Sequence, residues 1–346
     1  MSLQSFGLTS AFSISLVFMT SVLFSPSGAF ADTDERGVSF FTLRDRGDGD
    51  DPSDYFGEGR GSLTAGWCGV DQTELKFLAP AAEIAPFRIP EEILDVDRVE
   101  ELPVDTVLES VSNGPDGEML MYIHGYYIDF EKGCRRATIF KENVGLDDNF
   151  LWFSWPSAGS FVNYPRDEVN LFWSVPDMAR AISDLHARFG DGNVNLAGHS
   201  LGGRGLALAL YEVANANPEA KFGEVVFLAP DIDFDVFRKL LPRIRPIAQS
   251  ITLYTSSLDA ALVASEQLHG YPRLGQSGND VTLLDGVEVV DVSDLPFTSA
   301  NGHLYHIYNS EVGSDLNQLV TQGTLADQRR NLDKTGSNLW RLLPDK

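Results

Sequence analysis

One stretch, Asn193–Gly203, constrains this chain more than any other. It reads as a short apolar strand, then Gly198-His-Ser-Leu-Gly202, then an apolar helix from Leu201 to about Ala216. A serine at a sharp strand-to-helix turn needs small neighbours, and Gly198 and Gly202 let strand and helix approach closely. Ser200 would stand at a helix N-terminus, where free N–H groups and the helix dipole favour negative charge. The pattern therefore predicts that Ser200 is a nucleophile.

Strand and helix patterns alternate from Met119 to the end of the chain. This alternation predicts an α/β fold with a mostly parallel central sheet and helices on both faces. The chain has 346 residues, 43% of them hydrophobic, which suits a single domain over residues 32–346. We expect strands at 37–42, 62–70, 75–87, 118–123, 150–155, 193–197, 223–229, 250–255 and 287–291. We expect helices at 130–144, 167–189, 201–216, 234–241, 258–268 and from about 310, and a partly helical segment at 91–108.

The N-terminal residues 1–31 carry no charged side chain. Phe6 to Phe24 is mostly apolar, and Ala29-Phe30-Ala31 matches a small-residue cleavage site before Asp32. We interpret residues 1–31 as a secretory signal peptide, although its first residues lack Lys and Arg. An uncleaved membrane anchor is the alternative. The expected product is exported to the periplasm or secreted, and it has no stable membrane insertion after cleavage.

The net charge of −24 excludes several kinds of partner. A surface of this sign repels nucleic acid and anionic lipid headgroups, so neither is expected as a ligand. Residues 32–60 form an acidic Gly/Asp-rich segment, and we interpret its densest acidic run, residues 45–54, as a solvated loop because no acidic run there follows the EF-hand pattern. No metal-binding motif occurs, and no metal or cofactor is expected. Cys68 and Cys134 either form a disulfide in an exported protein or remain two thiols.

A serine hydroxyl needs a base within hydrogen-bond reach. In chains with an elbow of this kind, the serine comes first, the acid second and the histidine third. His303 follows Gly302 in a loop beyond the last clear strand, where the base is expected. His306 is the alternative base, and His199 occupies a variable position of the elbow, from which we expect it to point elsewhere.

The base in turn needs a carboxylate to orient it. Asp259 follows the strand that ends at Thr255 through a short turn, and we favour it as the acid. It would also serve as the N-cap of the following helix. Asp231 and Asp233, which follow the preceding strand, are the alternative acids.

The turn at His124-Gly125 ends a continuous apolar run of the kind that forms a central strand. In hydrolases of this type the N–H just past such a turn supplies half of an oxyanion hole. We therefore expect the backbone N–H groups of Tyr126 and Leu201 to form that hole.

Several ordered motifs together resemble a little-characterised bacterial α/β-hydrolase family allied to esterases and lipases. They span about Phe41 to Tyr308, and are Phe41-Thr-Leu-Arg-Asp-Arg46, His124-Gly-Tyr126, Phe153-Ser-Trp-Pro-Ser157, Gly198-His-Ser-Leu-Gly-Gly203, Leu228-Ala-Pro-Asp231, Tyr254-Thr-Ser-Ser-Leu-Asp259 and Gly302-His303. The resemblance implies the α/β-hydrolase fold, serine-dependent hydrolysis and no cofactor. Members usually carry Asn after the His-Gly-aromatic turn, where this chain has Tyr127.

These residues lead to one hypothesis and two alternatives. The hypothesis is a serine hydrolase that cleaves small carboxylic esters through an acyl-enzyme formed on Ser200. The same site would also suit an acyltransferase or an amidase, and a catalytically inactive binding protein would keep only the fold. Some aromatic residues near the strand ends would line an acyl pocket, while most pack in the core: Tyr126, Tyr127, Phe130, Trp155, Phe161, Tyr164, Phe172 and Trp173. The sequence gives neither the natural substrate nor the oligomeric state.

Overall fold

The computed structural model describes residues 36–49, 51–71, 94–111, 118–296, 299 and 301–344. Within this part of the chain, one sheet of eleven strands runs in the order β10-β11-β9-β8-β7-β6-β4-β5-β1-β2-β3. The strands are β1 (Gly37–Arg46), β2 (Phe56–Val70), β3 (Val96–Leu102), β4 (Met119–Ile123), β5 (Phe150–Ser154), β6 (Val194–His199), β7 (Phe222–Leu228), β8 (Ala248–Thr255), β9 (Glu288–Asp291), β10 (Leu332–Lys334) and β11 (Leu339–Leu342).

The sheet is mostly parallel, as the alternating pattern predicts. Strands β1, β5, β4, β6, β7, β8, β9 and β11 pair in parallel, while β2 and β3 at one edge and β10 at the other are antiparallel. Ile123 at the end of β4 pairs with Gly198 near the end of β6, and Leu228 at the end of β7 pairs with His199 and with Tyr254. The carboxyl ends of the central strands therefore meet at one edge, where open α/β sheets place their sites.

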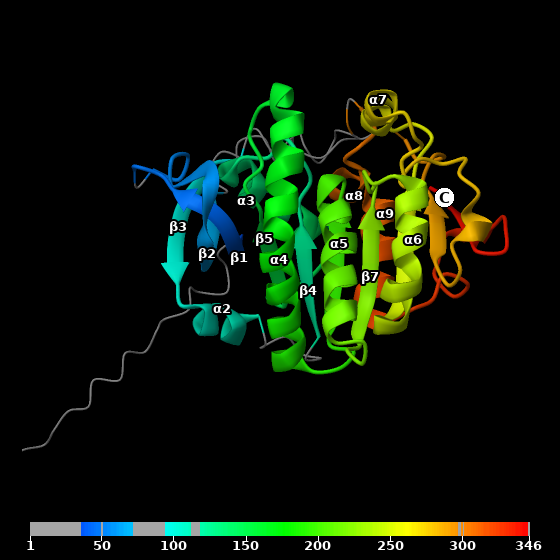
Figure 1. Ribbon diagram of the computed structural model, residues 1–346, viewed down its shortest axis with the longest axis horizontal. Helices are drawn as coiled ribbons and strands as arrows, with labels where there is room; N and C mark the ends of the chain where they lie inside the picture. Colours follow the sequence, from blue (N-terminus) through cyan, green and yellow to red (C-terminus); the bar gives the residue numbers. More distant parts are fainter. Residues whose placement is uncertain are drawn as a thin grey trace, which may run out of the picture. The chain divides into compact units, whose positions relative to one another are not determined.

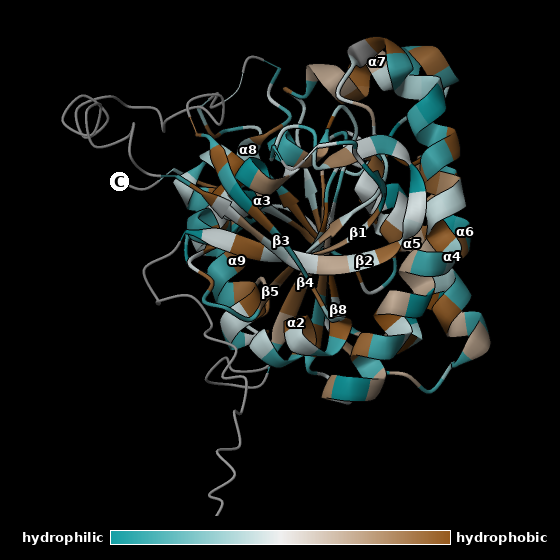
Figure 2. Cartoon of the chain, turned by 90° about the vertical axis from the view of Figure 1, so that its left-hand side faces the viewer, coloured by the Kyte–Doolittle hydropathy of each residue, from teal (hydrophilic) through white to brown (hydrophobic). Residues whose placement is uncertain are grey.

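Helices cover both faces of the sheet. Those on one face are α4 (Tyr164–Phe189), α5 (Leu201–Ala216) and α6 (Phe234–Ile244), and those on the other are α3 (Phe130–Val144), α8 (Tyr305–Tyr308) and α9 (Ser310–Gln322) (Figures 1 and 2). The short helix α2 (Val104–Ser110) packs near β2, and α7 (Ala260–His269) lies beyond the carboxyl ends of the strands (Figure 1). The described residues also include 3₁₀ turns at Phe161–Asn163, Arg245–Ile247 and Val281–Leu283.

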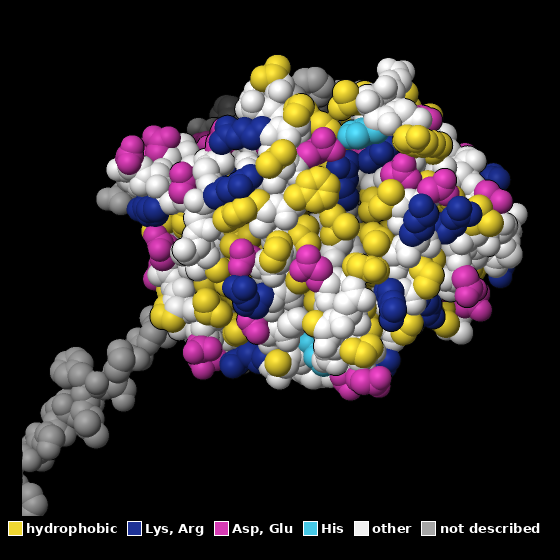
Figure 3. Space-filling view, in the orientation of Figure 1, with side chains coloured by type: hydrophobic (Ala, Val, Ile, Leu, Met, Phe, Trp, Pro, Cys, Tyr) yellow, Lys and Arg dark blue, Asp and Glu magenta, His cyan; other side chains and the backbone are white. Residues whose placement is uncertain are grey.

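The central strands are apolar because they are covered on both sides. All residues of β4, β5, β6 and β7 are buried. Their side chains alternate between two hydrophobic clusters, one under α4, α5 and α6 and the other under α3 and α9. The outer face of the first helix layer still carries exposed Val169, Phe172 and Val236, and Figure 3 shows hydrophobic and charged side chains mixed across it.

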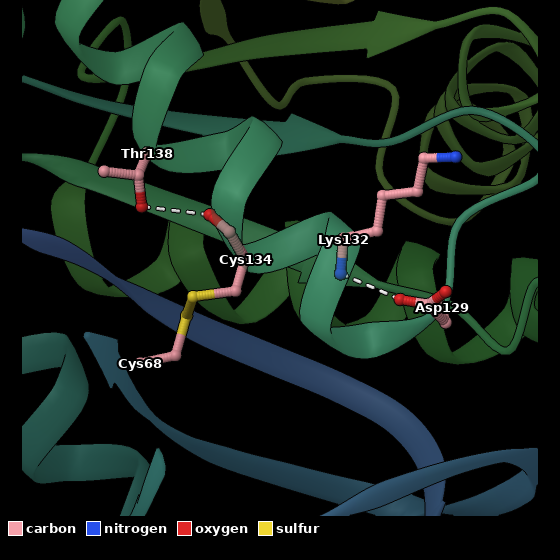
Figure 4. Close-up of a disulfide and its surroundings, with 5 residues drawn as sticks. All are labelled: Cys68, Asp129, Lys132, Cys134 and Thr138. Carbon is pink, nitrogen blue, oxygen red and sulfur yellow. Dashed lines mark hydrogen bonds between the residues drawn. A yellow bond between two sulfur atoms is a disulfide. The ribbon is translucent and has the colours of Figure 1, made fainter. Parts of the chain in front are cut away.

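A disulfide joins Cys68 of β2 to Cys134 of α3, with a Cα–Cα distance of 6.4 Å (Figure 4). The pairing resolves the choice that the sequence left open. Helix α3 starts locally from Asp129, whose carboxylate accepts a hydrogen bond from the Lys132 N–H at 2.8 Å. The disulfide thus fixes a helix that begins just after the His124–Tyr127 turn.

The structure adds strands in two places where the sequence predicts none. The segment 91–108 is partly helical as predicted, since α2 lies there, but β3 precedes α2 and pairs with β2. The strand predicted at 287–291 is β9, and it is not the last one. Strands β10 and β11 follow it, and β11 pairs with β9. The strand expected at 75–87 lies outside the described residues.

The proposed signal peptide, residues 1–31, also lies outside the described residues. In the part of the chain that the structure describes, no helix combines the length and the apolar character needed to cross a membrane.

Candidate active site

Ser200 occupies the turn between β6 and α5 in a strained conformation. Its φ of 55° and ψ of −122° lie where a residue with a side chain is rarely found. Backbone hydrogen bonds hold it there: its N–H donates to the Leu228 carbonyl at 3.0 Å, and its own carbonyl accepts from the Asp231 N–H at 3.0 Å. The strain is therefore supported by the neighbouring strand β7.

Glycines allow the β4 turn to lie directly against this serine. A Cβ atom on Gly125 would be 2.9 Å from Ser200 Cβ, and one on Gly202 would be 2.2 Å from the His124 carbonyl oxygen. Both contacts are too short for any side chain. The turn after β4 and the serine elbow consequently form one continuous backbone surface.

His303 and Asp259 meet at the same edge of the sheet. The imidazole Nδ1 lies 2.6 Å from Oδ2 of the carboxylate, and both residues are buried. The other oxygen, Oδ1, accepts the N–H groups of Ala261 and Leu262 at 3.1 and 3.0 Å as the N-cap of α7. An ionised carboxylate only accepts, so Nδ1 carries the proton and Nε2 presents its lone pair.

His199 links this pair to the elbow. Its Nε2 lies 3.1 Å from the His303 carbonyl oxygen, and the centroids of the two rings are 4.6 Å apart. The sequence predicts no role for His199, because its position is variable in the motif. In the structure its hydrogen bond holds the His303 backbone against His199, which directly precedes Ser200.

The alternative base, His306, is engaged elsewhere. Its ring is fully buried, and its Nε2 lies 3.1 Å from the Tyr122 hydroxyl. Burial, and then the neighbouring His303, hold the pKa of His306 well below its ordinary value, and burial next to His306 does the same for the pKa of His199. Both rings are therefore neutral. The Asp259 carboxylate contacts His303 and not His306, which favours His303 as the base.

The alternative acids also have other partners. Asp231 is buried, and its Oδ1 accepts from Arg273 Nε and from Ser265 Oγ, each at 2.6 Å. Burial alone would raise the pKa of Asp231, but Arg204 and Arg273 outweigh it and hold that pKa below its ordinary value. Asp233 caps α6 by accepting from the Val236 N–H at 2.9 Å.

The residues expected to form an oxyanion hole flank the elbow. Leu201 is the first residue of α5, so its N–H has no carbonyl partner within that helix. Tyr126 follows Gly125, and its ring packs edge-on against Tyr164 with centroids 5.0 Å apart. Tyr127 has a φ of 65°, a conformation in which Asn is several-fold enriched, so the Asn expected there from the resemblance would suit this backbone.

His124 contributes no charge to the site. Burial, and then the nearby Arg44, lower the pKa of His124 to about 3. Its Nδ1 donates to the Gly125 carbonyl at 2.7 Å, and its ring stacks on Trp155 with centroids 5.2 Å apart. It serves as a neutral support for the turn.

Residues 102–322 match the profile of a family described as alpha/beta hydrolase of unknown function (DUF900). The chain belongs to this family. The match confirms the resemblance seen in the ordered motifs, and the sheet and its two helix layers agree with the fold that the resemblance implies.

Solved structures give further comparisons for this alpha/beta hydrolase. A hormone-sensitive lipase from a metagenome library is 15% identical, with a TM-score of 0.36, over 72% of this chain and 97% of that one. The product of the Listeria innocua gene lin2722 is 12% identical, with a TM-score of 0.39, over 65% and 98%. Carboxylesterase CesB from Bacillus subtilis is 12% identical, with a TM-score of 0.37, over 85% and 94%. At these scores we infer no activity from the likeness, and no curated protein sequence matches the chain.

The aromatic residues near the strand ends divide into two groups in this alpha/beta hydrolase. Phe130 and Trp155 are buried in the core, whereas Tyr126 and Tyr164 are partly accessible and Tyr127 and Phe172 are exposed. The Phe161 side chain lies outside the described part. Among the residues that the structure describes, no cluster of three or more His, Cys, Asp or Glu side chains could hold a metal ion.

Proposed function

We propose that this alpha/beta hydrolase cleaves carboxylic esters with Ser200 as nucleophile, His303 as base and Asp259 as the orienting acid. The observation that carries the proposal is the buried 2.6 Å contact between His303 Nδ1 and Asp259 Oδ2, at the sheet edge where Ser200 stands at a φ of 55°. A structural N-cap alone would need only one oxygen of Asp259, and Oδ1 already fills that role.

The proposed reaction has two halves. In the first, His303 Nε2 takes the hydroxyl proton as Ser200 attacks the ester carbonyl, and the imidazolium then protonates the leaving alcohol. In the second, water activated by the same imidazole hydrolyses the acyl-enzyme and restores Ser200. The N–H groups of Leu201 and Tyr126 would stabilise the oxyanion formed in each half.

The electrostatics of the site support a single protonation event. The rings of His124, His199 and His306 are neutral, since burial lowers the pKa of each of them. Only His303 among the histidines of the elbow region has a carboxylate partner to stabilise its cation. The partly accessible rings of Tyr126 and Tyr164 would contact an apolar acyl or alcohol group.

The proposal is tested with a fluorophosphonate probe and a panel of p-nitrophenyl esters of graded chain length. Ser200→Ala should abolish labelling and lower kcat by on the order of 10⁶-fold. Ser174→Ala is a matched control, because Ser174 is equally buried but only donates to the Asn170 carbonyl inside α4. Retained hydrolysis in Ser200→Ala would disprove the assignment. Competing alcohols and amines would reveal acyl transfer, and an amide panel would reveal amidase activity.

We also propose that the chain is exported after cleavage between Ala31 and Asp32. The disulfide between Cys68 and Cys134 supports this, because such bonds persist in oxidising compartments. Mass analysis of the protein recovered from cell fractions tests it. An intact N-terminus on protein recovered from membranes would indicate the uncleaved anchor instead.

A further inference from the structure

We infer that Asp167 is a positioning residue that holds the Tyr126–Tyr127 turn in the geometry needed to bind an oxyanion. The inference rests on the proposed serine hydrolase function. Asp167 lies in the first turn of α4 and is fully buried, although nothing in the sequence motifs pointed to it.

The Asp167 carboxylate collects three hydrogen-bond donors from two loops. Its Oδ1 accepts the Ala158 N–H at 2.8 Å, and its Oδ2 accepts the Ser157 hydroxyl at 2.5 Å. Burial raises the pKa of Asp167, while hydrogen bonding from Ser157, Ala158 and the Tyr127 backbone N–H lowers it, so the Tyr127 N–H also acts on this carboxylate. One buried side chain therefore ties the turn after β4 to the loop after β5.

The next backbone group of the turn is held in the same way. The Ile128 N–H donates to Ser157 Oγ at 3.2 Å, so Ser157 accepts from the turn and donates to Asp167. The guanidinium of buried Arg44 also donates hydrogen bonds to the Ile128 and Ser157 carbonyl oxygens, at 2.6 and 2.9 Å. The two successive N–H groups after Tyr126, those of Tyr127 and Ile128, are thus both held by this network.

This anchoring matters because the turn is strained. Tyr127 is a bulky residue with a φ of 65°, and such a conformation persists only where the surroundings over-determine it. Releasing the Tyr127 N–H would let the peptide plane between Tyr126 and Tyr127 rotate. The neighbouring plane, which carries the Tyr126 N–H, would then lose its direction toward the carbonyl bound at Ser200.

An ionised carboxylate suits this position better than an amide. Three donors converge on Asp167, and a carboxylate has acceptor sites for all of them. In Asp167→Asn one oxygen becomes an NH₂ group, which cannot accept a hydrogen bond, so a single acceptor oxygen remains for the donors that the carboxylate serves. We expect Asp167→Asn to lower kcat for a p-nitrophenyl ester by about 10²-fold with little change in KM.

The deciding readout compares an ester with its thionoester, in which sulfur replaces the carbonyl oxygen. Sulfur is a weak hydrogen-bond acceptor, so oxyanion-hole donors stabilise the thionoester transition state much less. Asp167→Asn should therefore reduce the ester-to-thionoester ratio of kcat/KM by about tenfold or more. A residue that only supports the fold would lower both rates equally.

Three further variants complete the test. Ser157→Ala removes the link between Asp167 and the Ile128 N–H, and should reduce the same ratio even if Asp167→Asn does not fold. Tyr127→Asn relieves the positive φ and should recover part of the ratio in the Asp167→Asn background. Asp315→Asn is the matched control, because Asp315 is an equally buried acid that contacts Tyr254 and Arg329, and it should leave the ratio unchanged.

An unchanged ratio in both Asp167→Asn and Ser157→Ala would overturn the inference. A similar fall in Asp315→Asn would do the same. Failure of the proposed function would be recognised separately, since it would leave hydrolysis in Ser200→Ala intact.

Discussion

His303 Nδ1 lies 2.6 Å from Asp259 Oδ2, although the two residues are 44 positions apart in the chain. The same carboxylate caps α7 with its other oxygen. A helix N-terminus favours a negative charge, so the carboxylate also complements the end of α7 that it caps. One side chain therefore connects the start of a helix to the proposed base.

Exchanging the two candidate acids for amides should give opposite results. Asp259→Asn should lower kcat by about 10⁴-fold, because an amide no longer secures the proton on Nδ1. Asp231→Asn leaves buried Arg204 and Arg273 short of a partner, so it should mainly reduce the free energy of unfolding, by about 3–5 kcal/mol. Ester kinetics and urea denaturation on both variants check this, and equal mild losses of activity would contradict the choice of Asp259.

His199 should affect activity through its hydrogen bond to His303. His199→Phe keeps a ring but leaves the His303 carbonyl without its donor, so we expect kcat to fall about tenfold. His199→Gln offers an amide donor in a similar place and should recover most of that loss. Single-turnover kinetics with both variants measure the effect. Equal losses in the two would indicate that the ring packs there and that its hydrogen bond is unimportant.

Elements with strong local signals could be predicted from sequence. Helix α3 matches its expected range because Asp129 and Gly145 cap its ends, and α5 matches because the elbow starts it. Strand β3 was missed because its charged sequence resembles a surface helix, and pairing with β2 decides its conformation. Short β10 and β11 likewise depend on the edge that they join.

The residues of the site also differ in whether the sequence carries a signal for them. The positions of Asp259 and His303 follow from chain order and from the edge at which parallel strands end. His199 and Asp167 could not be found in this way, because each contacts a backbone group outside its own helix or strand. No periodicity or motif spacing records which carbonyl or N–H group will approach a given side chain.

The disulfide should contribute strongly to stability. It closes a loop with a sequence separation of 66 residues, for which chain entropy predicts about 4 kcal/mol. Urea denaturation with and without a reductant should show this difference. The double variant Cys68→Ala with Cys134→Ala should match the reduced protein and should not respond to reductant. A wild-type free energy of unfolding that is insensitive to reductant would show that the bond does not form.

Stability should also fall as pH rises, because of Glu224 at the start of β7. Burial, and then the neighbouring Glu288, raise the pKa of Glu224 from 4.5 to about 7, while Arg329 opposes the shift. Between pH 4.5 and about pH 7 the folded protein holds a proton on Glu224 that the unfolded chain releases. The stabilisation from this proton is therefore fully present below pH 4.5 and is lost as the pH rises through about 7. The shift corresponds to about 2–3 kcal/mol after allowance for partial solvent screening.

Glu224→Gln keeps an acceptor for the Ser250 hydroxyl but cannot ionise. Urea denaturation at about pH 5 and about pH 8 should therefore show a steeper loss in the wild type than in the variant, and parallel losses would contradict the assignment to Glu224.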